Sequence, residues 1–381
     1  MNQNIDKMSP FMVMEVLERA QELECKGINV IHMEVGEPDF NVPHCVVNAV
    51  SRAMENGHTH YTHSLGNHNL REAIADLYAR EYGTNFTADN VVVTSGSSPA
   101  ILMVLQLLCN PGDEVIIFNP GYSCYRNFIL AANAVPVEVK LNPDNGFKIN
   151  IDDIKAKITA KTRAIFVTSP SNPLGCVIPG ETLNAIANLG VTVISDEIYH
   201  GLVYSGKAHS ILEYTSDAIV INGFSKRYAM TGLRLGYVVA PLKYMRKLQI
   251  MQQNLFICAP SISQEAGLEA IRSADQDVEN MRITYDQRRK FMVENIRKIG
   301  LEISAEPEGA FYVFADARRY TNDSYRFAFD ILENAHVGVT PGTDFGYQGQ
   351  GFIRFSYANS LENIGEGLKR IDNYLKAKYN V

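Results

Sequence analysis

The 381-residue sequence lacks the features that define several large classes of protein. Its six cysteines contain no CxxC pair, which indicates buried or incidental thiols in a reducing compartment. The most apolar run, Ile101 to Cys109, is about half the length of a membrane span, and residues 1–10 show no signal-peptide pattern. A formal net charge of −7 gives no general attraction to nucleic acid or anionic lipid. We therefore expect a cytoplasmic protein that binds neither a membrane nor nucleic acid.

Length and hydropathy pattern predict two domains of different architecture. The chain exceeds the length at which one core usually stops growing. From about residue 67 to about residue 240, helix-like stretches alternate with continuously apolar strands, which is typical of a largely parallel sheet covered by helices. After about residue 242 the pattern changes to long helices with short strands, predicted at Leu301 to Ile303, Phe311 to Phe314 and Phe352 to Tyr357. The sequence therefore predicts a large α/β domain and a smaller α+β domain.

Lys226 is the residue around which the other signals gather. It lies between two apolar runs, Ala218 to Ile221 and Leu235 to Ala240, that read as buried strands. A lysine resists burial because its chain loses rotamer freedom and its ammonium loses water. A partly desolvated lysine, however, becomes a nucleophile towards carbonyl compounds. A solvated loop lysine fits the same local pattern, so the rest of the chain decides between the two interpretations.

Other polar residues also follow predicted strands, at the sheet edge where α/β folds bind ligands. The run Ser95 to Ala100 opens a helix and is suited to bind a phosphate, although a simple helix N-cap explains the same residues. Asn172 lies between two prolines, and Asp196 ends an apolar strand, where a buried carboxylate needs a cation. Arginines follow at 234 and 354. Pyridoxal 5′-phosphate would use these groups together, because it offers an aldehyde, a ring nitrogen and a phosphate.

The motifs that point to this cofactor occur in a fixed order along the chain. They are Gly36-Glu-Pro-Asp-Phe40, Tyr61-Thr-x-x-x-Gly66, Thr94-x-Gly96, Pro120-x-Tyr122, Ser171-Asn-Pro-x-Gly175, Asp196-Glu-x-Tyr199, Ser225-Lys226 with Arg234, and Arg354. In this order and spacing the chain resembles the class I/II aminotransferases, which are pyridoxal-phosphate enzymes of fold type I. The resemblance implies a large cofactor-binding domain over residues 47–275, with a mostly parallel, seven-stranded sheet between helices. Residues 1–46 and 276–381 would form the small domain.

The resemblance also implies roles for individual residues. Lys226 would hold the cofactor as an internal aldimine and move the substrate proton, while Asp196 would keep the ring nitrogen protonated. Tyr199 would bind the phenolic oxygen of the ring, Arg354 the substrate carboxylate, and Gly36 would lie beside the substrate. Asn172 would contact both cofactor and substrate. The remaining cofactor contacts would come from Gly96, Ser97, Ser98, Tyr122, Ser225 and Arg234, and from Tyr61 of the neighbouring subunit in a homodimer with shared active sites.

Two positions depart from the pattern of the family. Many relatives carry a serine that contacts the phosphate three residues before the lysine, where this chain has Gly223, and Ser225 is the nearby hydroxyl that would replace it. Some bacterial aspartate aminotransferases place a lysine at the end of the phosphate loop to bind the distal carboxylate, where this chain has Ser98. The prediction of an aspartate substrate therefore loses one of its supports.

The predicted activity is the transfer of an amino group from an amino acid to a 2-oxo acid by a ping-pong mechanism. The donor would be aspartate, alanine or a related amino acid, and the acceptor 2-oxoglutarate or pyruvate. A C–S β-lyase of the same fold is the alternative, and a ligand-sensing regulatory domain is a third interpretation. No metal is expected, because the spacing of His58, His60 and His63 matches no specific set of metal ligands.

Overall fold

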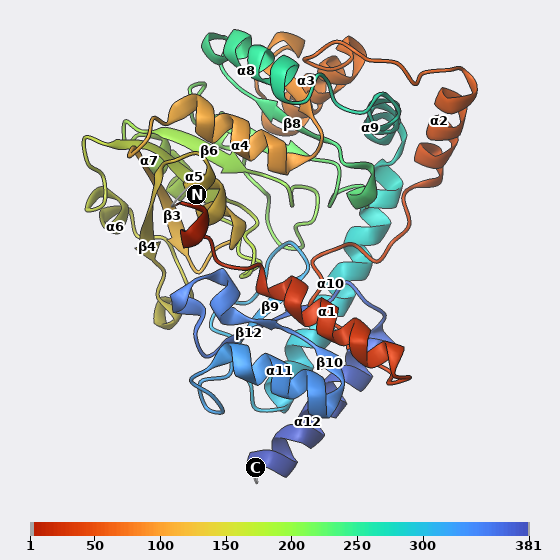
Figure 1. Ribbon diagram of the computed structural model, residues 1–381, viewed down its shortest axis with the longest axis vertical. Coiled ribbons are helices and arrows are strands. Elements are labelled where there is room, and N and C mark those ends of the chain that lie inside the picture. The colour runs from red at the N-terminus through yellow and green to blue at the C-terminus, as the bar shows by residue number, and fades with distance from the viewer. Residues whose placement is uncertain (1–3, 380–381) are drawn as a thin grey trace.

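The computed structural model describes residues 4–379, and its largest feature is a single sheet with helices on both faces (Figure 1). The sheet consists of β2 (Val91–Thr94), β3 (Glu114–Asn119), β4 (Val135–Lys140), β5 (Thr162–Thr168), β6 (Thr192–Asp196), β7 (Ile219–Gly223) and β8 (Gly236–Val239). Their order is β2-β8-β7-β6-β5-β3-β4, in which only β8 is antiparallel to its neighbours. The predicted α/β fold with a mostly parallel, seven-stranded sheet is confirmed.

Both faces of the sheet are buried, because successive strand residues pack into different cores. Val91 and Val93 contribute to one hydrophobic core, while Val92 between them contributes to the other. The helices around the core of Val92 are α4 (Ser97–Leu108), α5 (Cys124–Ala131) and α8 (Leu242–Leu255). Those around the opposite core are α2 (His44–Glu55), α3 (His68–Tyr82), α6 (Ile151–Lys155), α7 (Gly180–Ala187) and α9 (Ser261–Ser273). This double burial explains why the strand sequences are continuously apolar.

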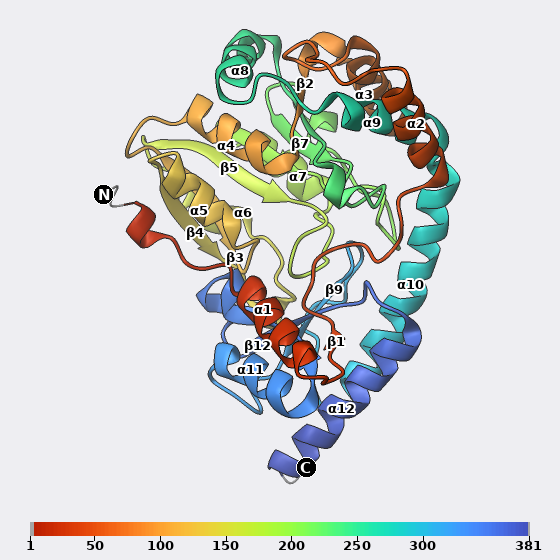
Figure 2. The ribbon, with the colours of Figure 1, turned by 45° about the vertical axis from the view of Figure 1, so that its right-hand side comes forward.

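The second part of the molecule has its own core and two small sheets. Its strands are β1 (Ile31–His32), which pairs with β10 (Val337–Gly338), and the antiparallel set β11 (Thr340–Pro341), β12 (Phe352–Ser356) and β9 (Tyr312–Asp316). Its helices are α1 (Met12–Cys25), α11 (Ser324–Ala335) and α12 (Leu361–Tyr379). Figure 2 shows α10 (Asp275–Lys298) running from the region of the large sheet down to this second part. Because α10 contributes Val278 to one core and Tyr285 to the other, the limits at residues 47 and 275 stay a prediction.

One predicted strand is wrong. Residues Leu301 to Ile303 form no strand, and only Glu302 makes a single bridge, with Asp316 at the end of β9. Gly300, with φ of +80°, turns the chain out of α10, and a single paired residue is too short to build a ladder.

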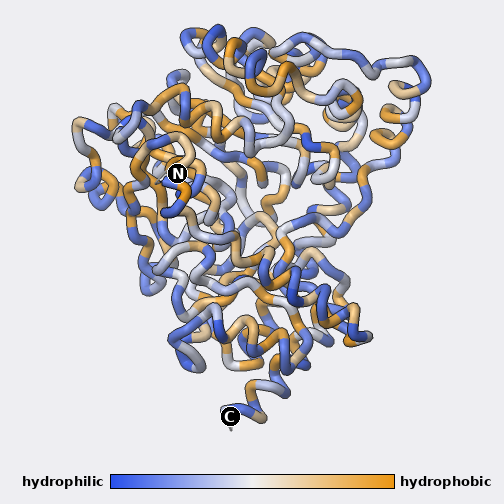
Figure 3. The backbone as a smooth tube through the Cα atoms, in the orientation of Figure 1, coloured by the Kyte–Doolittle hydropathy of each residue, from blue (hydrophilic) through white to orange (hydrophobic). Residues whose placement is uncertain are grey.

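Hydropathy alternates along the outer helices, which carry hydrophilic and hydrophobic residues in turn (Figure 3). Each such helix buries one stripe against a core and leaves the other in water. Within residues 4–379, no helix is both long and apolar enough to cross a membrane.

The carboxyl ends of β5, β6 and β7 bring the predicted site residues to one edge of the sheet. Asp196, the last residue of β6, is in register with Thr168 on β5 and with Ile221 on β7. β7 ends at Gly223, which pairs with Gly236 at the start of β8. The segment between them carries Lys226 and therefore leaves and re-enters the sheet at this same edge.

Candidate active site

A cavity of about 330 Å³ lies between the carboxyl edge of the large sheet and the second part of the chain. This volume lies within the range of pockets for small molecules. The predicted site residues that line it are Gly36, Ser97, Ser98, Tyr122, Asn172, Asp196, Tyr199, Ser225, Lys226, Arg234 and Arg354. Residues separated by more than 300 positions in the sequence thus meet around one space.

Lys226 extends its amine into this cavity without a carboxylate partner. Its Nζ donates a hydrogen bond of 2.6 Å to the backbone oxygen of Gly36, and no ion pair involves it within residues 4–379. Burial lowers the pKa of the amine to about 8, although the charge of Glu37 acts in the opposite direction. The amine is therefore partly neutral near physiological pH, which is the state that attacks a carbonyl group.

Asp196 is a buried carboxylate that faces the same cavity. One oxygen accepts a hydrogen bond of 2.7 Å from the hydroxyl of Tyr125, and the other accepts one of 3.0 Å from the backbone N–H of Ile198. Burial raises the pKa of Asp196 to about 6, and no cation pairs with it among the described residues. A protonated ring nitrogen would supply the missing positive charge.

The start of α4 and Arg234 form a cradle for an anion. Gly96 precedes the helix with φ of +97°, and a Cβ there would lie 2.7 Å from Nη2 of Arg234. Glycine at this position thus lets the guanidinium approach the first N–H groups of α4, beside Ser97 and Ser98. The helix N-terminus and the arginine together favour a phosphate.

Arg354 occupies the opposite side of the cavity and is almost fully buried. Its Nη1 donates a hydrogen bond of 3.0 Å to Oδ1 of Asn172, and its Nη2 donates to the backbone oxygen of Glu34 and to Thr340. The guanidinium lies 4.2 Å from the ring centroid of Tyr312, and its Nε has no partner. No carboxylate of residues 4–379 forms an ion pair with this guanidinium, so the arginine is available to an anionic ligand.

The structure adds residues that sequence reasoning missed. Tyr125 donates to Asp196 and accepts a hydrogen bond of 2.8 Å from Thr168. Burial raises the pKa of Tyr125 well above its ordinary value, so its hydroxyl keeps the proton that it donates. Tyr312 shares a hydrogen bond of 2.8 Å with Tyr199. Tyr125 follows the motif at Tyr122 by three residues, but no spacing rule shows which of the two tyrosines reaches the carboxylate.

Two predicted residues lie outside the lining of this cavity. Gly96 adjoins it through Arg234, whereas Tyr61 lies on the surface with 80% of its area exposed. Within residues 4–379, Tyr61 therefore has no place in the site of its own chain.

Gly223, where many relatives carry a serine, is buried in β7. A Cβ there would lie 3.0 Å from the backbone oxygen of Leu235 and 3.1 Å from Cδ1 of Ile198, so a side chain would be crowded. The hydroxyl that lines the cavity nearby belongs to Ser225.

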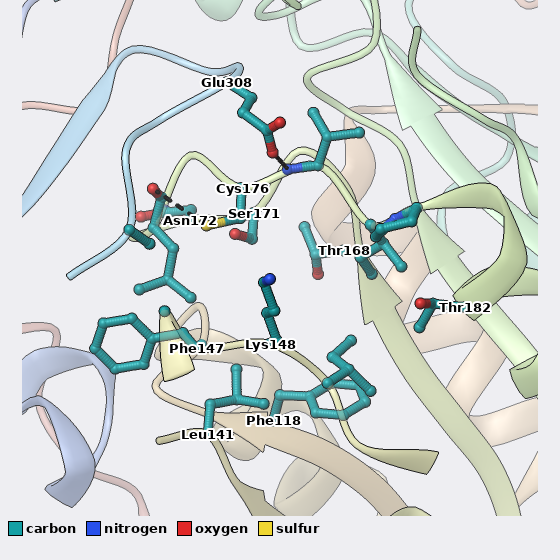
Figure 4. A pocket seen from close by; sticks show the side chains of 18 of the residues that line it. Phe118, Leu141, Phe147, Lys148, Thr168, Ser171, Asn172, Cys176, Thr182 and Glu308 are labelled. Carbon is teal, nitrogen blue, oxygen red and sulfur yellow. Dashed lines mark hydrogen bonds between the residues drawn. The ribbon is translucent and has the colours of Figure 1, made fainter. Parts of the chain in front are cut away.

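A larger cavity of about 770 Å³ adjoins the first one but contains none of its charged groups. The two share Tyr122, Tyr125, Thr168 and Asn172 as a common wall. Figure 4 shows Lys148 pointing into this second space towards Ser171, and Glu308 accepting a hydrogen bond from the backbone of Val177. Lys226, Asp196 and Arg354 line only the smaller cavity, so we place the chemistry there.

No group of three or more histidine, cysteine, aspartate or glutamate side chains in the described part of the chain is arranged to hold a metal ion. The groups present instead fit pyridoxal 5′-phosphate in three respects. The site offers a carbonyl-reactive amine, a buried carboxylate without a cation, and an anion cradle that a Cβ at Gly96 would fill.

Comparison with known proteins agrees with this geometry. The family described as Aminotransferase class I and II matches residues 28–371. The chain is 42% identical to the (5-formylfuran-3-yl)methyl phosphate transaminase of Methanocaldococcus jannaschii, with 96% of each chain covered. It is 36% identical to the valine–pyruvate aminotransferase of Mycobacterium tuberculosis, with 97% of each covered. Among solved structures, the aspartate aminotransferase of Thermus thermophilus with maleate has a TM-score of 0.94 and 35% identity, over 98% of this chain and 99% of that one.

Proposed function

The chain belongs to the class I and II aminotransferase family, and from this premise we propose that it moves an amino group from an amino acid to a 2-oxo acid with the residues of the 330 Å³ cavity. The family implies pyridoxal 5′-phosphate as the cofactor. The observation that carries the proposal is the meeting of Lys226, Asp196 and Arg354 around one cavity, each without an ion-pair partner in residues 4–379. An amine, a carboxylate and a guanidinium match the three charged or reactive groups that cofactor and substrate bring.

Pyridoxal phosphate, when bound, supplies an aldehyde for an amine and a ring that accepts electrons as the Cα–H bond of an amino acid breaks. The chain would bind its phosphate through Arg234 and the start of α4, while Asp196 would hold the proton on the ring nitrogen. Tyr122 and Tyr199 line the same space and would orient the ring.

Lys226 would also serve as the base that moves the substrate proton. Its amine lies in the cavity, and burial lowers its pKa to about 8, which suits a group that must give and take a proton. Arg354 would bind the substrate carboxylate, because its planar guanidinium offers two parallel N–H groups. Gly36 and Tyr312 lie close together in the wall of this cavity.

The relatives of this chain differ in the substrates that their names give. The names of the relatives include a valine–pyruvate enzyme, an aspartate enzyme and an enzyme for an aldehyde phosphate. We propose an ordinary amino acid as donor and pyruvate or 2-oxoglutarate as acceptor, in two half-reactions on one site.

We further propose that the enzyme is a homodimer in which Tyr61 reaches the site of the partner chain. Tyr61 is a large side chain with 80% of its area exposed, next to Thr62, whose N–H donates a 3.5 Å hydrogen bond to the thiol of Cys258. Such an exposed aromatic residue, with apolar neighbours at Leu255 and Ile257, is typical of an interface.

The proposal is tested with the Lys226→Ala variant of the cofactor-loaded enzyme. We expect no transfer of an amino group and no visible absorbance from the covalently held cofactor, whereas Lys376→Ala on the exposed side of α12 should leave both unchanged. Undiminished turnover in Lys226→Ala would overturn the assignment. Incubation with an amino acid alone separates the related lyase reaction, which would release pyruvate and ammonia continuously.

A further inference from the structure

The number of cations around the cavity limits the charge of the substrate. Three basic side chains line it, namely Lys226, Arg234 and Arg354. Under the proposed function, Lys226 and Arg234 serve the aldehyde and the phosphate of the cofactor. Only Arg354 then remains for the substrate, and its side chain is fixed by bonds to Asn172, Glu34 and Thr340. One guanidinium accommodates one anionic group.

The wall formed by α1 is apolar. Phe11, Met14 and Leu17 line the cavity together with Val35, and the ring of Phe11 meets that of Tyr122 edge to face at 6.1 Å. Met14 is 45% exposed, although α1 uses a different face (Val16, Ala20 and Leu23) to pack into the core. Met14 lies outside the core to which α1 contributes, and a methionine on a cavity wall offers an adaptable surface to an apolar ligand.

A carboxylate in the cavity wall also disfavours a second negative group on the substrate. Glu37 lines the cavity and accepts a hydrogen bond from the hydroxyl of Thr231. Within this cavity, a second negative group on the substrate would meet this charge with no further cation to offset it, since Lys148 lines only the adjoining space. An unpaired carboxylate in such a site loses its hydration without any compensating interaction.

In the proposed homodimer, the segment that carries Tyr61 would bring no permanent cation to the site of the partner chain. Tyr61 lies within residues 57–66, and this stretch contains neither lysine nor arginine. The same is true of residues 255–260, which the bond from Thr62 to Cys258 holds beside it. The exposed side chains there, Leu255 and Ile257, are apolar.

From these observations we propose that the site accepts substrates with a single anionic group on an uncharged body. These are monocarboxylic amino acids with small, apolar or aromatic side chains, together with their 2-oxo acids. Aspartate, glutamate and 2-oxoglutarate are discriminated against because their second carboxylate finds no partner. The inference rests on the proposed function and specifies its substrate class.

The test compares substrates on the cofactor-loaded enzyme. We expect kcat/KM for L-alanine, L-leucine and L-phenylalanine to exceed that for L-aspartate and L-glutamate at least about tenfold, the discrimination that about 1.4 kcal/mol gives. Pyruvate should likewise be a better acceptor than 2-oxoglutarate. A preference for the dicarboxylic donors would overturn this inference but not the proposed aminotransferase function. No transfer from any amino acid would overturn the proposed function itself.

A charge placed on the α1 wall supplies the second arm. In Met14→Lys, the ratio of kcat/KM for L-aspartate to that for L-leucine should rise at least about tenfold, because the new ammonium can bind the distal carboxylate. The matched control is Ile283→Lys on α10, which is 44% exposed and lies outside the cavity, and it should leave the ratio unchanged. A ratio that does not move in Met14→Lys would remove α1 from the substrate wall and overturn the proposal.

Discussion

Lys226, Asp196 and Arg354 each lack the ion-pair partner that a charged side chain inside a protein usually has. Within residues 4–379 none of the three takes part in an ion pair, although Asp196 and Arg354 are nearly inaccessible to solvent. Uncompensated charges are costly in a stable fold, so they mark a place where a ligand completes the interactions. Their chemistry is therefore best tested one residue at a time.

The first prediction concerns the amine of Lys226. Because burial lowers its pKa to about 8, the neutral, reactive form is fully present above that pH and is lost as the pH falls below it. The rate at which cofactor-free enzyme captures pyridoxal phosphate should rise with pH and level off above about pH 9. The measurement is the growth of visible absorbance after mixing, with Nα-acetyl-lysine as the control amine of ordinary pKa. A rate that climbs to pH 10.5 in parallel with the control would contradict the prediction.

The second prediction concerns the shape of Arg354. In Arg354→Lys the charge is kept but the two parallel N–H groups are lost. A charged hydrogen bond contributes about 1.5 to 3 kcal/mol, so kcat/KM for the amino donor should fall roughly 10- to 100-fold. The amount of bound cofactor should not change, since Arg354 is not part of the anion cradle formed by Arg234 and the start of α4. Steady-state kinetics with unchanged kcat/KM would exclude a role in binding the carboxylate.

Glu197 links the elements behind the site. It is fully buried beside Asp196 and accepts hydrogen bonds from Ser210 at 2.9 Å and from Tyr78 at 3.0 Å. Tyr78 on α3 in turn accepts a hydrogen bond of 3.0 Å from Asn222 at the end of β7. This network connects α3, β6 and β7 and thereby fixes the distance between the strand that carries Asp196 and the one that leads to Lys226.

The third prediction follows from the burial of Glu197, which raises its pKa to about 7. The folded protein binds the proton of the Glu197 carboxyl more tightly than the unfolded chain does. The contribution of this group to the free energy of unfolding is therefore complete below about pH 4.5 and is lost as the pH rises through 7. Glu197→Gln removes the titration. The difference in Tm, wild type minus variant, should therefore be larger at pH 5 than at pH 8.

The measurement is thermal unfolding of both proteins at the two pH values. Glu213→Gln, at a partly exposed glutamate of the same region, serves as the control. A Tm difference for Glu197→Gln that stays constant between pH 5 and pH 8 would show that Glu197 does not titrate in this range.

At the scale of the whole molecule, exposed apolar side chains gather where α8 ends. Leu255 and Ile257 are 53% and 48% exposed, and Tyr61 lies in the neighbouring segment. Exposed apolar side chains grouped in this way are typical of an interface, which agrees with the homodimer that we propose.

The fourth prediction is that charge at this surface separates the subunits. The double variant Leu255→Glu and Ile257→Glu should sediment as a monomer at concentrations where the unmodified protein sediments as a dimer, and it should lose most of its activity. The control variant Leu361→Glu, at an exposed leucine of α12, should remain a dimer and keep its activity. Analytical ultracentrifugation decides the point, and a double variant that remains dimeric would place the interface elsewhere.

The sequence alone determined the alternation of helices with apolar strands and the position of Lys226 between two of them. Both follow from local rules, because periodicity and burial on two faces leave a direct trace in the residues. The residues predicted to line a common site do line one, apart from Gly96 and Tyr61. The strand predicted at Leu301 to Ile303 was wrong, because pairing depends on a partner that its own residues do not specify.

Only the tertiary structure decided what surrounds the reactive groups. It placed Tyr125 on Asp196, set Glu34 and Thr340 behind Arg354, and turned one face of α1 towards the cavity. These contacts join residues that are far apart along the chain, and no spacing rule encodes them. The pKa of an amine or a carboxyl is set by such surroundings, which is why the sequence located the reactive residues and the fold determined their chemistry.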